Sequence, residues 1–156
     1  MKKYINPEHV RKDEQKIVMN EIAKQNHCPF CTDNLLKYHK KPILKKGKYW
    51  IITDNQWPYD KIKHQLLAIY KDHIEHLKDM NPKAGEELIR LFQEEIDKRK
   101  IPGGGLAMRF GGLNKDGSYG NTVFHLHAHL IEPDLKALGP NETWKFKFGQ
   151  SKEYKK

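Results

Sequence analysis

Three histidines alternate with apolar residues in the stretch 122–131, and this alternation is the strongest chemical signal in the sequence. Successive side chains of a β-strand point to opposite faces, so His125, His127 and His129 would share one face. Each imidazole has two ring nitrogens that need partners when buried, so packing alone does not account for three in a row. The pattern predicts a chemical face on which the rings bind a metal ion, a phosphate group or one another.

Cys28 and Cys31 are the only cysteines of the chain and lie three positions apart. In a reducing compartment such a pair is more often metal-binding or redox-active than a structural disulfide. Two thiolates supply half of a tetrahedral zinc site, which needs two more nitrogen or sulfur ligands. The alternatives are a reduced, metal-free pair packed as small hydrophobic side chains and a redox pair. No thioredoxin-like succession of strand, helix and strand surrounds the pair, which disfavours the redox interpretation.

The elements that must position these residues follow from periodicity and turn residues. A helix over 7–24 precedes the cysteines, and two strands at 42–46 and 48–53 would form a hairpin around Gly47. The apolar run 64–70 predicts a buried strand. A long amphipathic helix would begin near Asn81, with Pro82 in its first turn, and end before the Pro-Gly-rich run 102–105.

Three more strands are expected in the second half of the chain, at 106–110, 122–131 and 144–148. The glycine-rich loop 111–120 precedes the histidine strand, so its backbone N–H groups could approach a phosphate, although such loops are more often simple turns. These elements predict a single α+β domain over 1–156. It would have an N-terminal helical extension at 1–27, a core at 28–149 and a basic tail at 150–156.

Charge and hydropathy limit the class of protein. The chain has 156 residues and a formal net charge of +9, and no apolar run approaches the ~20 residues that cross a bilayer. Its first residues carry lysines but no apolar stretch of the kind that a secretory signal needs. We therefore expect a soluble, cytoplasmic protein without membrane contact. The lysine-rich stretch 35–53 would attract phosphate-bearing partners, although a solvated basic surface explains it equally well.

The run from Thr122 to Ile131, TVFHLHAHLI, resembles the signature of the histidine-triad (HIT) superfamily of nucleotide hydrolases and transferases. The similarity extends to 64–74, which resembles the strand and following histidine of that family, and to 55–58, which resembles its ribose-contacting turn. With the cysteine pair it spans about residues 28–149. The resemblance implies a HIT-like fold with a strongly bent antiparallel sheet, one main helix, an N-terminal helix and a homodimeric assembly.

The resemblance also implies roles for the residues around the triad. His127 would attack the α-phosphorus of a nucleotide and form a covalent nucleotidyl-histidine, while His129 would donate a hydrogen bond to the phosphoryl oxygens. Thr122 and Asn121 stand where many members carry Ser and Gln beside the leaving group, a departure that leaves the leaving-group preference open. Trp144 follows the triad after a longer spacer than in the best-known members.

In the zinc-bearing branches of that family, the equivalents of His73 and His125 complete the site begun by the cysteine pair. The resemblance thus implies a structural zinc held by Cys28, Cys31, His73 and His125. It assigns nucleotide contacts to Asn55, Trp57 and His64. For each of these three a structural role is the alternative: a turn residue, a core aromatic and a satisfied histidine.

Three functional hypotheses follow. The first is hydrolysis of a nucleotide phosphoanhydride or phosphoramidate, with adenine as the expected base. The second is nucleotidyl transfer, with phosphate or a sugar phosphate as acceptor in place of water. The third is a nucleotide- or nucleic-acid-binding regulator without turnover. The net charge motivates the third hypothesis, but no run of interleaved aromatic and basic residues matches a nucleic-acid-binding module.

Overall fold

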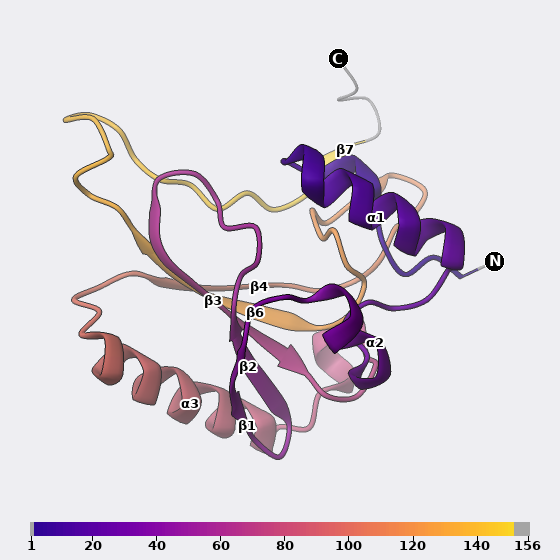
Figure 1. The fold of residues 1–156 in the computed structure, drawn as a ribbon, viewed down its shortest axis with the longest axis horizontal. Helices are drawn as coiled ribbons and strands as arrows, with labels where there is room; N and C mark the ends of the chain where they lie inside the picture. Colours follow the sequence, from indigo (N-terminus) through magenta and orange to yellow (C-terminus); the bar gives the residue numbers. More distant parts are fainter. Residues whose placement is uncertain (1, 152–156) are drawn as a thin grey trace.

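The computed structural model describes residues 2–151, which form an α+β fold around a five-stranded antiparallel sheet (Figure 1). The strands follow the order β1-β2-β3-β6-β4, and a separate two-stranded sheet joins β5 to β7. The elements are η1 (Pro7–His9), α1 (Asp13–Gln25), α2 (Thr32–Tyr38), β1 (Ile43–Lys46), β2 (Trp50–Asp54), β3 (Ile62–Tyr70), η2 (Leu77–Asp79), α3 (Lys83–Arg99), β4 (Gly105–Arg109), β5 (Gly117–Ser118), β6 (His127–Pro133) and β7 (Gln150–Ser151).

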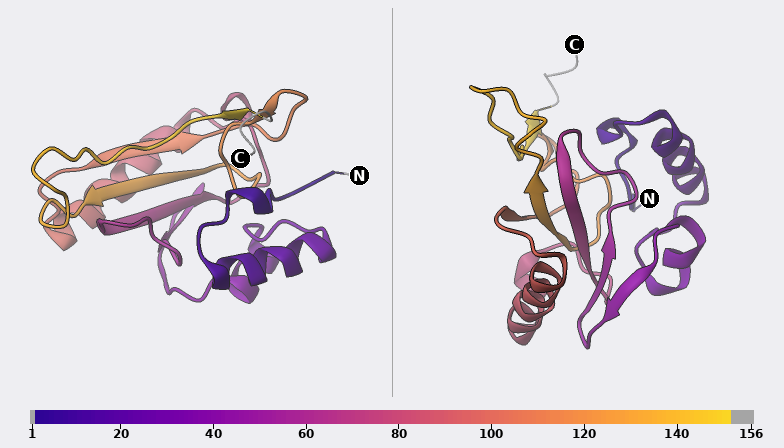
Figure 2. Two further views of the ribbon diagram at one scale, coloured as in Figure 1. Left: turned by 90° about the horizontal axis from the view of Figure 1, so that it is seen from above. Right: turned by 60° about the vertical axis from the view of Figure 1, so that its left-hand side comes forward.

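Helix α3 covers one face of the sheet, while α1 and α2 lie on the other (Figure 2). The face toward α3 holds the larger hydrophobic core, in which Leu66 and Ala68 of β3 and Ala128 and Leu130 of β6 pack against α3. These are alternate residues of their strands, as the two-residue period of a strand requires. The side chains between them on β3 and β6 face α1 and α2, so the sheet separates a packed core from the side that carries the triad.

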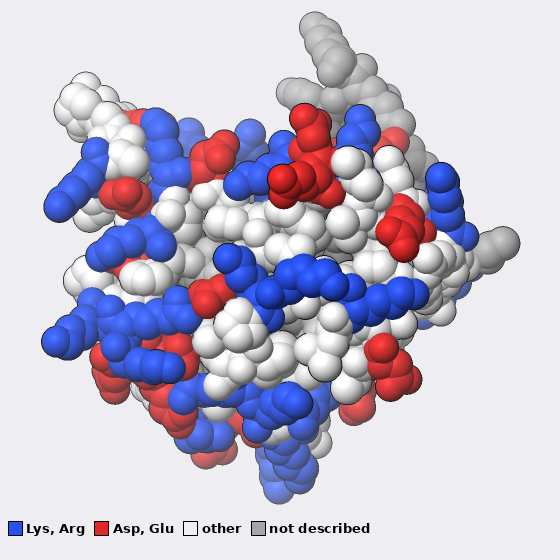
Figure 3. All heavy atoms as spheres, viewed as in Figure 1, with Lys and Arg blue, Asp and Glu red and all other residues white. Residues whose placement is uncertain are grey.

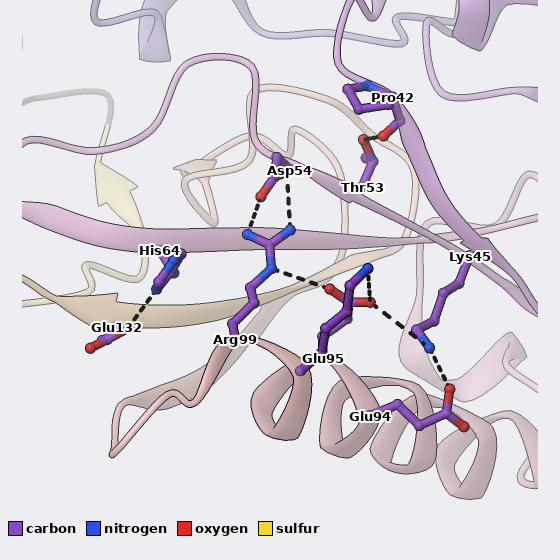
Figure 4. Close-up of polar contacts among 10 residues, drawn as sticks. Pro42, Lys45, Thr53, Asp54, His64, Glu94, Glu95, Arg99 and Glu132 are labelled. Atoms are coloured by element: carbon purple, nitrogen blue, oxygen red, sulfur yellow. Dashed lines mark hydrogen bonds and ion pairs between the residues drawn. The ribbon is translucent and has the colours of Figure 1, made fainter.

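Polar contacts fix α3 to the β1–β2 hairpin. The Glu87 carboxylate accepts hydrogen bonds from the backbone N–H groups of Lys48, Tyr49 and Trp50 at 2.7, 2.7 and 3.1 Å. Further along the helix, Arg99 pairs with Asp54 at 2.7 Å and with the fully buried Glu95 at 3.2 Å (Figure 4). Buried charges need partners of this kind, and the Arg99–Asp54 pair joins the end of α3 to β2.

The main helix and the first four predicted strands are found close to their expected positions. The fifth predicted strand is found only in part, and the prediction of a sixth at 144–148 was wrong. In 122–131 only the part from His127 is a strand. The residues before it form hydrogen bonds elsewhere: the N–H of Phe124 donates to Tyr4 and that of Leu126 to Ile74, at 2.8 and 2.7 Å. The segment 144–148 is irregular, because its alternating aromatic residues pack against Tyr59 and Arg109 without pairing with a strand.

The N-terminal helix is also shorter than predicted. Residues 7–24 divide into η1 and α1, and α2, which directly follows Cys31, had no sequence signal strong enough to predict it. Of the basic tail, residues 150–151 form β7, and 152–156 lie outside the described residues. None of the helices within 2–151 combines the length and the apolar character needed to cross a membrane.

Candidate functional site: an imidazole row beside a cysteine–histidine cluster

The triad lies where β6 begins, on the face of the sheet toward α1 and α2. In the β3–β6 ladder His127 is opposite Ile69 and His129 is opposite Leu67, while on the other side of β6 His127 is opposite Arg109 of β4. Paired residues of antiparallel strands share a face, so Arg109 lies beside the imidazoles. The predicted alternation is therefore confirmed for His127 and His129, whereas His125 precedes the strand.

One hydrogen bond fixes the tautomer of His127. Its Nδ1 lies 2.6 Å from the carbonyl oxygen of His125, which can only accept, so Nδ1 carries the proton. The lone pair of the ring is then on Nε2, the nitrogen that a nucleophile would use. Burial lowers the pKa of His127 to about 4, so the ring is neutral at physiological pH.

A chain of two hydrogen bonds gives His129 the opposite tautomer. The N–H of Tyr59 donates to Oε1 of Gln65 at 2.8 Å, and Nε2 of Gln65 donates to Nδ1 of His129 at 3.1 Å. Because Nδ1 of His129 accepts, its proton is on Nε2. Burial also lowers the pKa of His129 well below its usual value. The neutral ring of His129 thus offers a donor beside the free lone pair of His127, with the two ring centroids 5.2 Å apart.

The two cysteines meet His73 and His125 on the same side of the sheet. One potential ligand atom from each of the four residues lies within 4.8 Å of all the others. The Sγ of Cys28 is 3.3 Å from Nδ1 of His125, the Sγ of Cys31 is 3.4 Å from Nδ1 of His73, and the two Nδ1 atoms are 3.3 Å apart. In a tetrahedral zinc site, bonds of about 2.0–2.3 Å place neighbouring ligand atoms roughly 3.3–3.8 Å apart. These three pairs therefore have the spacing of ligands in a zinc site, and the Sγ of Cys31 is 4.0 Å from Nδ1 of His125.

The surroundings of His125 favour this interpretation over a metal-free thiol pair. Its Nε2 donates to the carbonyl oxygen of Tyr70 at 2.5 Å, which leaves Nδ1 unprotonated and turned toward both sulfurs. A backbone carbonyl that orients a ligating imidazole through its other nitrogen is a usual feature of metal sites. Burial raises the pKa of the Cys28 thiol to about 12. A bound cation would lower this pKa and favour the thiolate.

The structure brings three further predicted residues to the triad. Asn55, Trp57 and Thr122 line the same cavity as His127 and His129. Asn55 also forms the turn that was its alternative interpretation, because its Oδ1 accepts from the N–H of Trp57 at 3.1 Å. Both interpretations of Asn55 are thus compatible with the structure.

Helix α1 and the residues before it cover this cavity. Arg11, Gln15 and Met19 form part of its wall, and its volume is about 70 Å³. Cavities that enclose a small-molecule ligand usually measure about 300–1,000 Å³. His127 is 9% exposed and His129 5% exposed. In this conformation the imidazoles therefore lie beneath a closed cover.

Two predicted site residues are not brought into the cavity. His64 points to the α3 side of the sheet, where its Nδ1 lies 2.6 Å from Oε2 of Glu132 (Figure 4). Its position in β3 has the parity of Leu66 and Ala68, so the strand turns it away from the triad. Asn121 is 3% exposed and is not part of the cavity wall, and its Oδ1 has no hydrogen-bond partner among the described residues.

Sequence reasoning missed Gln65, Arg11 and Arg109. Gln65 follows His64, for which a nucleotide contact was predicted, but the parity of the strand places Gln65, not His64, on the triad face. The two arginines come from distant parts of the chain, and no local pattern distinguishes them from other surface cations. Phe30, between the two cysteines, lies edge-on to His127 with centroids 5.2 Å apart.

The basic composition is visible on the surface. Lys and Arg side chains form a band across the middle of the face drawn in Figure 3, and acidic side chains gather mainly above and below this band. Such a distribution raises the local concentration of anionic ligands.

Comparison with known proteins gives a consistent assignment. The family model described as "Scavenger mRNA decapping enzyme C-term binding" matches residues 18–143. A comparison with curated proteins gives no match. The fold and the imidazole row are those of a histidine-triad protein, and the chain belongs to that superfamily through the family whose model it matches.

Solved structures show the same fold. A HIT family hydrolase from Clostridium thermocellum has 24% identity and a TM-score of 0.50, covering 70% of this chain and 93% of its own. A histidine triad protein from Clostridium difficile has 18% identity and a TM-score of 0.52, covering 69% and 92%. A zinc-bound histidine triad family protein from Mycobacterium smegmatis has 18% identity and a TM-score of 0.53, covering 81% and 85%.

Proposed function

We propose that this protein is a nucleotide hydrolase that acts through a covalent nucleotide on Nε2 of His127. The observation that carries the proposal is the 2.6 Å hydrogen bond from Nδ1 of His127 to the carbonyl of His125. It holds a neutral imidazole with its lone pair on the other nitrogen, which is the state that nucleophilic catalysis requires.

In the first step, the lone pair of Nε2 forms a bond to the α-phosphorus as the bond from phosphorus to the leaving group breaks. The leaving atom takes the electron pair of the broken bond. Negative charge on the phosphoryl oxygens must be stabilised during this exchange, and the Nε2–H of His129 is a donor for that purpose. Thr122 offers a hydroxyl at the same cavity, which we assign to the bridging atom.

In the second step, water attacks phosphorus and the bond to Nε2 breaks. The water loses a proton to the surrounding solvent, the nucleoside monophosphate departs, and His127 regains its lone pair. The tautomer of His127 is unchanged throughout, because the carbonyl of His125 holds the proton on Nδ1. A nucleotidyl transferase would use the same first step with phosphate or a sugar phosphate as the second acceptor.

We also propose that the cysteine–histidine cluster binds a structural zinc ion. With four protein ligands, the ion would join the loop around Cys28 to the histidine run and would offer no open position for water. Its ligand His125 supplies the carbonyl that orients His127, so the metal would stabilise the nucleophile's geometry through one residue.

Turnover of two substrates tests the catalytic proposal. An adenosine phosphoramidate and a dinucleoside triphosphate are incubated with the protein and with His127→Ala. We expect kcat/KM to fall by about a thousandfold or more in the variant, since removal of a nucleophile leaves only binding and charge stabilisation. His76→Ala, which removes an exposed histidine, is the matched control. Equal turnover by the protein and by His127→Ala would overturn the assignment.

Product analysis separates the two enzyme hypotheses. Hydrolysis releases the nucleoside monophosphate at all phosphate concentrations, whereas transfer to phosphate yields the diphosphate in proportion to the phosphate added. A sample denatured at alkaline pH, where a phosphorus–nitrogen bond to histidine survives, should contain protein-bound nucleotide in either case, and His127→Ala should contain none.

A further inference from the structure

A second, larger cavity adjoins the one that contains the triad. Its volume is about 790 Å³, which is ample for a nucleotide. The two cavities share Arg11, Tyr59, Arg109 and Gly120 in their walls, so they meet beside His129. We call the larger one the outer cavity.

The walls of the outer cavity are strongly basic. Four cationic side chains line it against one carboxylate, that of Asp60. The cations are Arg11, Arg109, Lys145 and Lys147. Arg109 stands at the junction with the triad, and within 2–151 it forms no ion pair with a carboxylate. Its charge is therefore available to an anionic ligand.

Arg109 is held firmly in place. Its Nε and Nη2 donate to the carbonyl oxygen of Lys147 at 2.9 and 2.6 Å, and its Nη1 donates to the hydroxyl of Tyr59 at 3.3 Å. The guanidinium lies 3.8 Å from the ring centroid of Phe146. Arg11 lies over the ring of Tyr59 at 3.9 Å, so both guanidiniums face the junction from stacked positions.

Aromatic rings continue from the triad into the outer cavity. Phe146 lies 5.6 Å from His129, and Tyr59 lies 5.5 Å from Trp144, measured between ring centroids. Trp144 and Phe146 are half-buried, so part of each ring remains accessible. Accessible aromatic rings beside cations are the combination that binds a nucleobase and its phosphates together.

Resting on the proposed function, we infer that the outer cavity holds the leaving group, and that Arg109 with Arg11 selects leaving groups that carry phosphate and a planar base. When a phosphoanhydride is cleaved, the leaving phosphate oxygen departs with its electron pair as an anion, which a guanidinium stabilises directly. An amine leaving group must instead gain a proton, and two neighbouring cations disfavour the cationic product. The arginines therefore favour nucleotides joined through a phosphate chain over phosphoramidates.

The ratio of two kcat/KM values tests this selection. The substrates are P1,P3-di(adenosine) triphosphate and adenosine 5′-phosphoramidate, which share the nucleotide that reaches His127. We expect Arg109→Gln to lower the ratio by about 10- to 100-fold, as for loss of a group that stabilises developing charge. Arg90→Gln, on the outer surface of α3, is the control and leaves the ratio unchanged. Melting temperatures confirm that each variant is folded.

A second pair of variants tests the base. Trp144→Ala should raise KM for the dinucleoside triphosphate about tenfold relative to ATP, whose leaving group has phosphates and no base, and Trp144→Phe should restore most of the loss. An unchanged ratio in folded Arg109→Gln overturns the inference even where His127→Ala is inactive. Equal losses on both substrates overturn it as well, because they indicate a general role for Arg109. If His127→Ala stays active, it is the proposed function that fails.

Discussion

Gln65 donates a hydrogen bond from its Nε2 to Nδ1 of His129 at 3.1 Å, while its Oε1 accepts from the backbone of Tyr59. The second bond sets the orientation of the amide, and the amide in turn sets the tautomer of His129. Through these two bonds, the side chain of Gln65 fixes the proton of His129 on Nε2, beside His127.

Gln65→Glu should therefore impair catalysis more than binding. A carboxylate cannot donate to Nδ1 of His129, so the ring would protonate that nitrogen and lose the neutral donor on Nε2. We expect kcat to fall about 10- to 100-fold with KM within threefold, measured on a dinucleoside triphosphate. Gln93→Glu, at an exposed position of α3, introduces the same charge as a control. An unaltered kcat in folded Gln65→Glu would contradict the role of the amide.

The metal proposal predicts one zinc ion per chain. Elemental analysis of the purified protein should find it, and Cys28→Ser and His73→Ala should each lose most of it. A thiol reagent should label neither cysteine of the native protein and both after chelation, because zinc-bound thiolates react slowly. We expect chelation to lower the melting temperature by about 5 °C or more. Free thiols in metal-replete protein would show that the cluster is a packed, reduced pair.

Substitution of His64 should affect stability and leave catalysis intact. The hydrogen bond from His64, with Lys63 nearby, lowers the pKa of the Glu132 carboxyl in the folded state. Such a group contributes stability above its unfolded pKa, near 4.3, and loses that contribution as the pH falls through the folded value. Glu132→Gln should therefore be less stable than the native protein by about 1–2 kcal/mol at pH 7, with the difference vanishing at the acidic end.

Denaturant unfolding of Glu132→Gln at a series of pH values measures this difference. Turnover by His64→Ala should stay within about threefold of the native value, since the side chain lies on the far side of the sheet. A large loss of kcat/KM at native-like stability would return His64 to the nucleotide site.

We expect α1 to move when a nucleotide enters the triad cavity. The triad cavity holds about 70 Å³, and its cover packs through Met19 and Ile22 against Cys28 and Val123. We expect amide hydrogen exchange across 11–25 to increase when a non-hydrolysable adenine nucleotide is added, while exchange in β3 stays constant. Increased protection of α1 would instead mean that the helix closes onto the ligand from a more open state.

The sequence predicted the parts of the site that local periodicity encodes. Alternation fixes the face of His127 and His129, and the resemblance to the histidine-triad superfamily named a metal cluster whose four members do converge. The sequence could not place Arg109. The proximity of Arg109 to His127 comes from the pairing of β4 with β6, which no local pattern encodes. The segment 144–148 shows the converse: an alternating pattern forms a strand only where a partner with unpaired backbone groups is available.

Arg11 and Arg109 both lie where the triad cavity meets the outer cavity, but they come from different elements, the segment before α1 and β4. Arg109 is the last residue of β4 paired with β6 and lies directly opposite His127, so its distance from His127 is set by strand pairing. Arg11 precedes α1, the helix that we expect to move when the substrate enters. Arg109 can thus define where a phosphate chain binds. Arg11 can return to the junction only after the substrate is bound, so recognition of the leaving group would be a late event in each catalytic cycle.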